Sequence, residues 1–306
     1  MFFSKWFLPK PYNEGYLPEE NGHKVYFAEY GNPNGKPVLF FHGGPGGSCK
    51  SRHIKGINLK KYRVITLDQR GCGLSTPLGK IENNTTLDIL KDYNRLVNIL
   101  NIKEKITLRG GSWGATIALL WAERNPQIVE KILISQVFLA NSDFHHWEFE
   151  GTKYIYPEFV EHLNKKSKGN ITSYYNKLIQ SNNKKKQIEA SNEFCWFERI
   201  CGSMNPKFAE NTYICDKDLA SNRIYSHYAD NNFFLGENDI LKNISKIKDI
   251  ETVIVHNRLD LICPFKGAYD LHQKLNNSEL IAVDEFGHVG NKIRKTMIER
   301  LNKSLR

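Results

Sequence analysis

Apolar residues occur along this chain in two alternating spacings. Short runs rich in β-branched residues, within 37–47, 62–75, 105–111 and 131–138, predict buried strands. Between them, residues 86–102 and 113–126 carry apolar residues at the spacing of about 3.6 that predicts helices. This alternation is typical of an α/β fold with a mostly parallel, doubly wound sheet and helices on both faces.

The alternation stops near residue 140. Residues 141–238 are rich in aromatic residues, Lys and Asn, contain no apolar strand run and predict an inserted helical cap. Two more strand runs, at 251–260 and 278–288, flank a helical segment at 265–275. We therefore predict a core formed by residues 1–140 and 239–306 and a cap formed by residues 141–238.

Composition narrows the class of protein. The chain has 306 residues, of which 40% are hydrophobic, so it can bury a sizeable core. No apolar run reaches the ~18 residues of a membrane-spanning helix, and the first residues lack the cleavage site of a signal peptide. The six Cys form no C-x-x-C pair and no zinc pattern. We expect free thiols, a cytoplasmic location, no membrane partner, no metal and no other cofactor.

The net charge of +10 raises the possibility of nucleic-acid binding. However, the Lys-rich stretches 164–170 and 182–187 are short and Asn-rich, and the other cations are scattered. We expect a solvated surface and no nucleic-acid partner. Nothing in the sequence predicts an oligomeric state.

Residues 110–114 read GGSWG, a G-x-S-x-G pattern between a predicted strand and a predicted helix. In that context the pattern is typical of a nucleophile elbow, which exposes Ser112 at the carboxyl edge of the sheet. The alternative is a Gly-rich turn whose Ser only caps a helix. The flanking strand and helix favour Ser112 as a nucleophile.

A nucleophilic serine needs a base and a group that orients the base. Asp260 ends one late strand and His288 follows the next, so both should lie at the edge that holds Ser112. His256 lies inside a strand and His272 lies within a helix, which makes them weaker candidates for the base. Asp284 competes with Asp260 for the role of the acid but lies within or just after its strand.

The segment HGGPGG, at 42–47, provides backbone N–H groups for a developing oxyanion. We expect the donors to be Trp113 and one residue of the glycine loop, Gly43 or Gly44. A phosphate-binding loop is the alternative, but the segment matches neither the G-x-x-x-x-G-K-[ST] pattern nor the G-x-G-x-x-G pattern.

Together, HGGPGG, DQRGCG, GGSWG and the DLICP at 260–264 resemble the proline iminopeptidase family of the α/β-hydrolase fold. The resemblance covers most of 11–138 and 250–290. It implies an enzyme without a cofactor that releases N-terminal proline from peptides through Ser112, Asp260 and His288.

The resemblance also implies that the cap binds the free amine and the proline ring of the substrate. It places a first amine-binding carboxylate at Glu198. It assigns the apolar slot for the ring to Phe138, Phe233 and Cys263, because a ring needs apolar and aromatic contacts.

Two positions depart from the family pattern. Tyr225 stands where the family carries a second amine-binding Glu, and Ser135 stands where it carries an Arg. A lost charge-assisted hydrogen bond costs ~1.5–3 kcal/mol, which would weaken amine binding. Tyr225 could replace part of this interaction, or another carboxylate could; the candidates are Asp230, Glu193 and Asp239.

We therefore predict a serine aminopeptidase that acts on short peptides through an acyl-enzyme. One alternative is an esterase, lactonase or amidase for small substrates, with the same triad but no requirement for a free amine. Tyr225 and Ser135 favour that alternative, whereas Glu198, Phe138 and Cys263 oppose it. A non-catalytic binding protein on the same fold is the other alternative, and the complete set of Ser, Asp and His opposes it.

Overall fold

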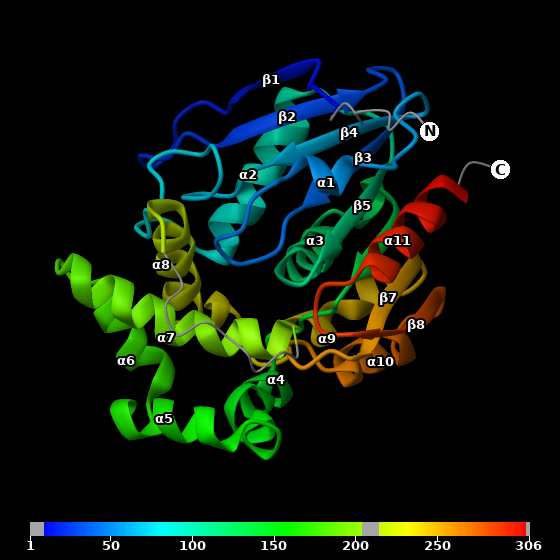
Figure 1. Cartoon of the computed structure of the whole chain (residues 1–306). Helices are drawn as coiled ribbons and strands as arrows, with labels where there is room; N and C mark the ends of the chain where they lie inside the picture. Colours follow the sequence, from blue (N-terminus) through cyan, green and yellow to red (C-terminus); the bar gives the residue numbers. More distant parts are fainter. Residues whose placement is uncertain (1–8, 204–213, 304–306) are drawn as a thin grey trace, which may run out of the picture.

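The strands of the chain form one twisted sheet, seen in a computed structural model that describes residues 9–203 and 214–303 (Figure 1). In these residues the sheet has eight strands in the order β1-β2-β4-β3-β5-β6-β7-β8. β2 runs antiparallel to both of its neighbours, β1 and β4, and the other neighbouring strands are parallel. The strands are β1 (Asn13–Tyr16), β2 (Tyr26–Gly31), β3 (Lys36–Phe41), β4 (Tyr62–Leu67), β5 (Ile106–Gly111), β6 (Val129–Ser135), β7 (Glu251–Leu259) and β8 (Ser278–Phe286).

Successive side chains along the central strands point to opposite faces of the sheet and pack into two separate hydrophobic cores. In β6, Ile132 and Ile134 point to one face of the sheet and Leu133 points to the other. The first face packs against α2 (Thr86–Ile99), α3 (Trp113–Arg124) and α10 (Phe265–Gln273). The second packs against α11 (Asn291–Lys303) and lies beside α1 (Ser51–Ile54) (Figure 1). The predicted α/β sheet with helices on both faces is confirmed.

The described residues between β6 and β7 are mainly helical. It holds α4 (Ser142–His146), the π-helical segment η2 (Trp147–Gly151), α5 (Pro157–Ser167), α6 (Ile171–Ile179), α7 (Lys184–Ser203), α8 (Asp216–Asp230) and α9 (Asp239–Asn243). Short 3-10 segments are η1 (Pro126–Ile128), η3 (Thr152–Tyr154), η4 (Asn232–Phe234) and η5 (Ile244–Lys246). The helices α5, α6 and α7 gather on one side of the core (Figure 1).

These inserted helices have an apolar cluster of their own, which includes Leu163, Tyr175, Ile179 and Phe194. No strand interrupts them in 141–203 or 214–238, the described part of the predicted cap. The boundaries of the cap at residues 140 and 238 remain our proposal.

The elements that were not predicted from the sequence include β1, β2 and α11. β1 and β2 were not predicted, because the segment NEGY of β1 has no apolar run and is mostly exposed. In β2, the buried Glu29 interrupts the apolar pattern, and Arg63 of the neighbouring strand pairs with it at 2.5 Å. The third missed element is α11, whose buried Ile293, Met297 and Leu301 do recur at helical spacing.

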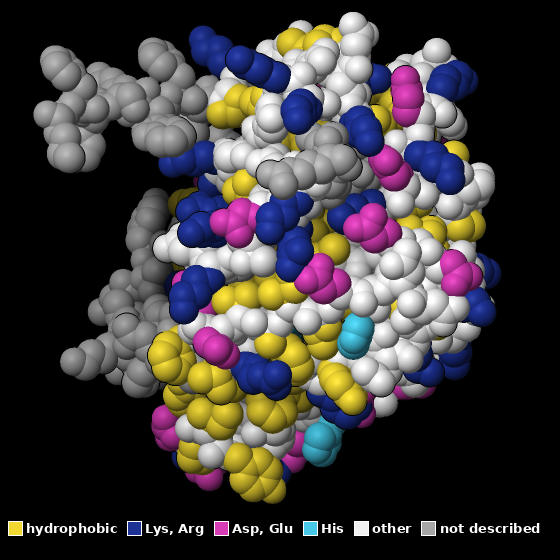
Figure 2. All heavy atoms as spheres, turned by 90° about the vertical axis from the view of Figure 1, so that its right-hand side faces the viewer, with side chains coloured by type: hydrophobic (Ala, Val, Ile, Leu, Met, Phe, Trp, Pro, Cys, Tyr) yellow, Lys and Arg dark blue, Asp and Glu magenta, His cyan; other side chains and the backbone are white. Residues whose placement is uncertain are grey.

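Charged side chains are distributed rather than gathered on the surface in view. Figure 2 shows Lys and Arg spread over one face with Asp and Glu between them. The lysines of the stretches 164–170 and 182–187 are exposed at an end of α5 and at the start of α7. Among the described helices, none combines the length and the apolar character needed to cross a membrane.

Candidate active site

Ser112 lies in the sharp turn between β5 and α3. Its backbone adopts φ 56° and ψ −131°, which is unfavourable for a residue with a side chain and is typical of strained functional positions. The turn leaves no room around its glycines. A Cβ at Gly110 would lie 2.3 Å from the carbonyl oxygen of Gly114, and one at Gly114 would lie 2.1 Å from that of Phe41. Both glycines are therefore required for the turn that presents Ser112.

Asp260 and His288 follow β7 and β8 and meet at the same edge of the sheet. His288 Nδ1 lies 2.8 Å from Asp260 Oδ2, and both side chains are buried. The other oxygen of Asp260 accepts hydrogen bonds from the backbone N–H groups of Ile262 and Cys263, at 3.0 and 2.9 Å. These contacts leave Nε2 of His288 as the nitrogen available for another partner.

The electrostatics of this pair favour a charged Asp260 and a basic His288. Burial raises the pKa of Asp260, but the charge of His288 and their hydrogen bond outweigh it, so the pKa lies below its ordinary value. Burial lowers the pKa of His288, but the charge of Asp260, their hydrogen bond and the charge of Glu198 raise it above its ordinary value. A base with a raised pKa is a stronger proton acceptor.

The competing candidates have other partners. His256 is buried in β7, where its Nδ1 accepts from the N–H of Val137 at 3.0 Å and its Nε2 contacts the carbonyl of Cys263 at 2.8 Å. His272 in α10 contacts Ser278 at 2.8 Å. Asp284 is exposed on β8. This geometry agrees with the structural role expected for His256.

Gln136 holds the loop that carries His288, and sequence reasoning missed it. Its Nε2 donates to the carbonyl of His288 at 2.6 Å, while its Oε1 accepts from the hydroxyl of Ser135 at 2.5 Å. The N–H of His288 also donates to the carbonyl of Gly202 in α7 at 2.9 Å. A second link from the insertion runs from Trp147 Nε1 to the carbonyl of Leu261, at 2.8 Å, beside Asp260.

The expected oxyanion donors lie around Ser112. Gly43 and Gly44 line the same pocket as Ser112, and the backbone of Gly44 adopts φ +135°. The N–H of Trp113 is at the first position of α3, where a helix provides no acceptor for it. The role of these three amides remains a proposal.

A buried hydrogen-bond chain supports this region and gives a role to Gln69, the glutamine of the motif DQRGCG. Gln69 donates its N–H to His42 Nε2 at 2.9 Å and its side-chain amide to the His42 carbonyl at 3.0 Å. Trp113 Nε1 then donates to Gln69 Oε1 at 3.0 Å. The glycine loop and the nucleophile elbow are therefore joined through one glutamine.

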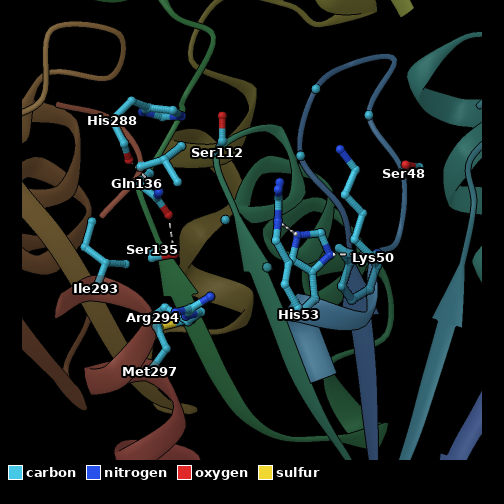
Figure 3. Close-up of a pocket in the computed structure, with 18 of the residues that line it drawn as sticks. Ser48, Lys50, His53, Ser112, Ser135, Gln136, His288, Ile293, Arg294 and Met297 are labelled. Carbon is cyan, nitrogen blue, oxygen red and sulfur yellow. Dashed lines mark hydrogen bonds between the residues drawn. The ribbon is translucent and has the colours of Figure 1, made fainter. Parts of the chain in front are cut away.

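Ser112 and His288 both line a pocket of ≈ 540 Å³ (Figure 3). Glu198 of α7 and Tyr225 of α8 also line it. Protein atoms surround the Glu198 carboxylate, yet solvent reaches it, because it faces the open pocket. Burial raises the pKa of Glu198, although the charges of His288 and Arg199 act in the opposite direction.

Glu148 is the second carboxylate of this region, and the sequence analysis did not identify it. The hydroxyl of Tyr225 donates to Glu148 Oε1 at 3.3 Å. Burial raises the pKa of Glu148 to about 7; the hydrogen bond from Tyr225 lowers it and the nearby charge of Glu198 raises it. The tyrosine that replaces the family's Glu is thus directly bonded to a carboxylate from a different segment, η2.

The three carboxylates that we had considered for this role have other partners. Asp230 accepts from Asn176 at 2.8 Å, and Glu193 accepts from Tyr175 at 2.7 Å. Asp239 accepts from the N–H of Gly236 at 2.6 Å. None of the three lines the pocket of Ser112; Glu148 does not line it either, but it accepts a hydrogen bond from Tyr225, which does.

The aromatic residues expected to form the proline slot lie behind Ser112. Phe233 is buried, with its ring centre 4.8 Å from that of Phe138 and 5.8 Å from that of Trp113. Burial and the charge of Asp260 raise the pKa of the Cys263 thiol, against a hydrogen bond with Ser112. Phe138 and Cys263 line a neighbouring cavity of ≈ 260 Å³, not the pocket of Ser112. Their role in ring recognition remains a prediction.

Among the described residues, no group of three or more His, Cys, Asp or Glu side chains is arranged to hold a metal ion. The chemistry that the described side chains can perform is nucleophilic attack by a serine, with a histidine–aspartate pair as its base.

Comparison with known proteins agrees with this geometry. A family model described as "alpha/beta hydrolase fold" matches residues 36–292. A proline iminopeptidase of Arabidopsis thaliana is 34% identical over 292 residues, which cover 92% of this chain and 76% of that protein. A proline iminopeptidase of Neisseria gonorrhoeae is 33% identical over 289 residues, which cover 92% of each chain.

Solved structures show the same fold at lower identity. The crystal structure of VinJ superposes with a TM-score of 0.66 at 18% identity, covering 96% of this chain and 99% of that one. A proline iminopeptidase of Mycobacterium smegmatis gives a TM-score of 0.62 at 16% identity, covering 95% and 98%.

Proposed function

The chain belongs to the proline iminopeptidase family of α/β hydrolases, and from this premise we propose that it is a serine aminopeptidase that releases N-terminal proline from short peptides. The observation that carries the proposal is a pair of carboxylates: Glu198 lines the pocket of Ser112 and His288, and the buried Glu148 is bonded to Tyr225 in the wall of that pocket. A cationic amine is attracted to such a pair, whereas a neutral acyl group gains nothing from it.

The catalytic cycle that we propose uses Ser112 as the nucleophile. Its Oγ attacks the carbonyl carbon of the N-terminal residue while His288 Nε2 takes the hydroxyl proton. The amides of Trp113 and of Gly43 or Gly44 stabilise the oxyanion that forms. His288 then gives its proton to the leaving amine, the C–N bond breaks, and the acyl-enzyme remains. Water, activated by His288, hydrolyses this ester and releases the free amino acid.

Asp260 and Gln136 act through His288 in this proposal. The carboxylate of Asp260 fixes the tautomer of the imidazole and stabilises its protonated form. Gln136 fixes the backbone of the same residue through its carbonyl. Both are positioning residues, since neither needs to touch the substrate.

The substrate amine would lie between Glu198 and Glu148 in this proposal, with Tyr225 holding Glu148. Tyr225 then serves recognition indirectly, although it carries no charge itself. The buried aromatic group of Phe138 and Phe233, together with Cys263, supports the back of the site, where we propose that the proline ring packs.

A comparison of blocked and free substrates tests this function. We expect hydrolysis of a prolyl amide, and a fall of about 10- to 100-fold or more in kcat/KM when its amine is acetylated. A fluorophosphonate should label wild-type protein and not the Ser112→Ala variant. Equal turnover of the acetylated amide would favour the esterase, lactonase or amidase alternative, and an unlabelled wild type would favour a binding protein.

We also propose that the protein works in a reducing compartment such as the cytoplasm. All six cysteines are free, and three of them, Cys72, Cys201 and Cys263, are buried. We propose no nucleic-acid or membrane partner.

A further inference from the structure

The pocket of Ser112 has a second end with the opposite charge. Lys50, Arg52, Arg109 and Arg294 line it, together with apolar residues of β3 and α11. In Figure 3, Arg294 and Met297 of α11 lie on one side of the hollow and Lys50 and His53 lie on the other. Ser112 and His288 lie at the upper end of this view. The catalytic region thus separates an acidic end from a basic one.

Arg109 is the most unusual of these cations. Its side chain on β5 is 5% exposed, and its Nε has no hydrogen-bond partner among the described residues. One other nitrogen, Nη1, donates to the carbonyl of His53, and its Cζ lies 5.6 Å from the centre of the Phe40 ring. Burial lowers the pKa of Arg109 to about 10, so it stays charged at neutral pH. A buried charge without a counter-ion is costly, and an anion that enters the pocket would remove this cost.

The other three cations of this end are also without carboxylate partners in the described part of the chain. Arg52 Nε contacts His53 Nε2 at 3.4 Å, and Arg294 donates to Asn291 Oδ1 at 3.0 Å. Lys50 forms no ion pair there. The one acidic residue that lines this end, Glu285, accepts from the N–H groups of Asn291 and Lys292, at 3.0 and 2.8 Å.

We propose that this basic end binds the C-terminal carboxylate of the peptide substrate, with Arg109 as its buried anchor. The proposal rests on the proposed aminopeptidase function and assigns the length of its substrates. A short peptide with free termini has a cation at one end and an anion at the other, as the two ends of the pocket require.

The spacing along β5 sets the length. Arg109 lies on β5, three residues before Ser112 in the turn that follows the strand, so their Cα atoms are at most about 11 Å apart at ~3.6 Å per residue. An extended peptide covers the same distance with about three residues, since each spans ~3.3–3.6 Å. With the scissile bond at Ser112, and with the reach of the Arg109 side chain, the carboxylate should belong to a leaving group of two or three residues. The preferred substrates are therefore tri- and tetrapeptides.

The test compares Pro-Gly-Gly with its C-terminal amide in the wild-type enzyme. We expect kcat/KM to be about 10- to 100-fold higher for the free carboxylate. Arg109→Gln should reduce this ratio to about 1–3 and leave the turnover of prolyl amide, which has no carboxylate, close to that of the wild type. Across peptides of two to eight residues, kcat/KM should be highest at three or four.

Lys50→Gln provides a second variant on the rim of the pocket, where the fold tolerates change, and should lower the ratio by a smaller factor. Arg258→Gln, which removes an arginine outside this pocket, is the matched control and should not alter the ratio. Equal kcat/KM for peptide and amide in the wild type would overturn this inference while leaving the aminopeptidase function intact. No hydrolysis of prolyl amide or of either peptide would overturn both.

Discussion

At the scale of single residues, the informative pair is Tyr225 and Glu148. The family resemblance expects a carboxylate at position 225, and the chain carries a tyrosine whose hydroxyl bonds to a carboxylate 77 residues away. Glu198 lines the pocket, Glu148 lies behind the Tyr225 that lines it, and the charge of Glu198 raises the cost of ionising Glu148. An entering ammonium group relieves that repulsion, which makes the pair selective for cationic ligands.

Glu148→Gln tests the role of this carboxylate. The amide keeps a hydrogen-bond partner for Tyr225 but removes the charge, so KM for prolyl amide should rise about 10- to 100-fold. Glu150→Gln is the matched control, because Glu150 lies two residues along the same π-helical segment and pairs with Lys153 at the surface. An unchanged KM in Glu148→Gln would contradict the proposed amine site.

The pH dependence of activity should include the titration of Glu148. Since the pKa of Glu148 is raised to about 7, it is neutral below that pH and charged above it. The pKa of His288 is raised above its ordinary value, so it too loses function as a base when the pH falls. We expect kcat/KM for prolyl amide, measured from about pH 5 to 9, to fall with acid through one protonation more in the wild type than in Glu148→Gln.

Gln136 should affect turnover rather than binding. Gln136→Ala removes the donor to the His288 carbonyl, which allows the imidazole to shift from the position that it needs. We expect kcat to fall about 10-fold with KM for prolyl amide nearly unchanged, because the amine contacts remain. A rise in KM with constant kcat would instead assign Gln136 to substrate binding.

At the scale of elements, segment η2 connects recognition to catalysis. It carries Glu148, and its first residue, Trp147, donates to the carbonyl of Leu261 next to the catalytic aspartate. A π-helical turn places side chains differently from an α-helix and is frequent at functional sites. This one turns Glu148 toward Tyr225 while Trp147 reaches the loop after β7.

Trp147→Phe removes only the donor of that link. We expect a loss of roughly 1 kcal/mol in the free energy of unfolding and a several-fold lower kcat. Trp121→Phe is the control, because the buried indole N–H of Trp121 has no hydrogen-bond partner among the residues that the structure describes. Equal effects of the two substitutions would show that packing, and not the hydrogen bond, matters at position 147.

Local patterns were enough to predict most of the sheet but not all of the site. Apolar runs identified β3 to β8, and the turn chemistry around Ser112 identified the elbow, because both depend on residues near one another in sequence. β2 was not predicted because the charged Glu29 interrupts its apolar pattern. Its burial depends on Arg63, which lies in another strand. Glu148 could not be predicted for the same reason: its significance comes from Tyr225, Glu198 and its own burial, which only the folded chain brings together.

At the scale of the whole molecule, a buried ion pair joins the sheet region to α2. Arg70 of the DQRGCG motif donates to Asp92 at 2.6 and 3.0 Å, and both side chains are fully buried. Such a pair adds little net stability compared with apolar residues, but the loss of one partner is costly. Without Arg70, the buried Asp92 would be compensated only in part by Arg95, which is partly exposed and donates to it at 3.0 Å.

Arg70→Met should therefore lower the free energy of unfolding by about 3–5 kcal/mol, measured by urea denaturation. The double variant Arg70→Met/Asp92→Leu should recover most of this loss. Lys36→Met, which breaks the exposed ion pair with Glu130, is the control and should cost less than about 1 kcal/mol. A small effect of Arg70→Met alone would mean that Arg95, which already donates to Asp92, is enough to compensate that carboxylate.

The hydrogen bond from His288 to Gly202 gives helix α7 two roles, one in substrate binding and one in positioning the catalytic base. Helix α7 carries Glu198, which faces the substrate, and it also holds the backbone of the catalytic base. A change in α7 that alters which amine is accepted would also move the base. The second carboxylate of this chain is instead provided by Glu148 of η2, held by Tyr225 of α8, so α7 need not change. In evolutionary terms, substrate preference can change through substitutions in α8 and η2, whereas α7 is constrained because it also holds the backbone of His288.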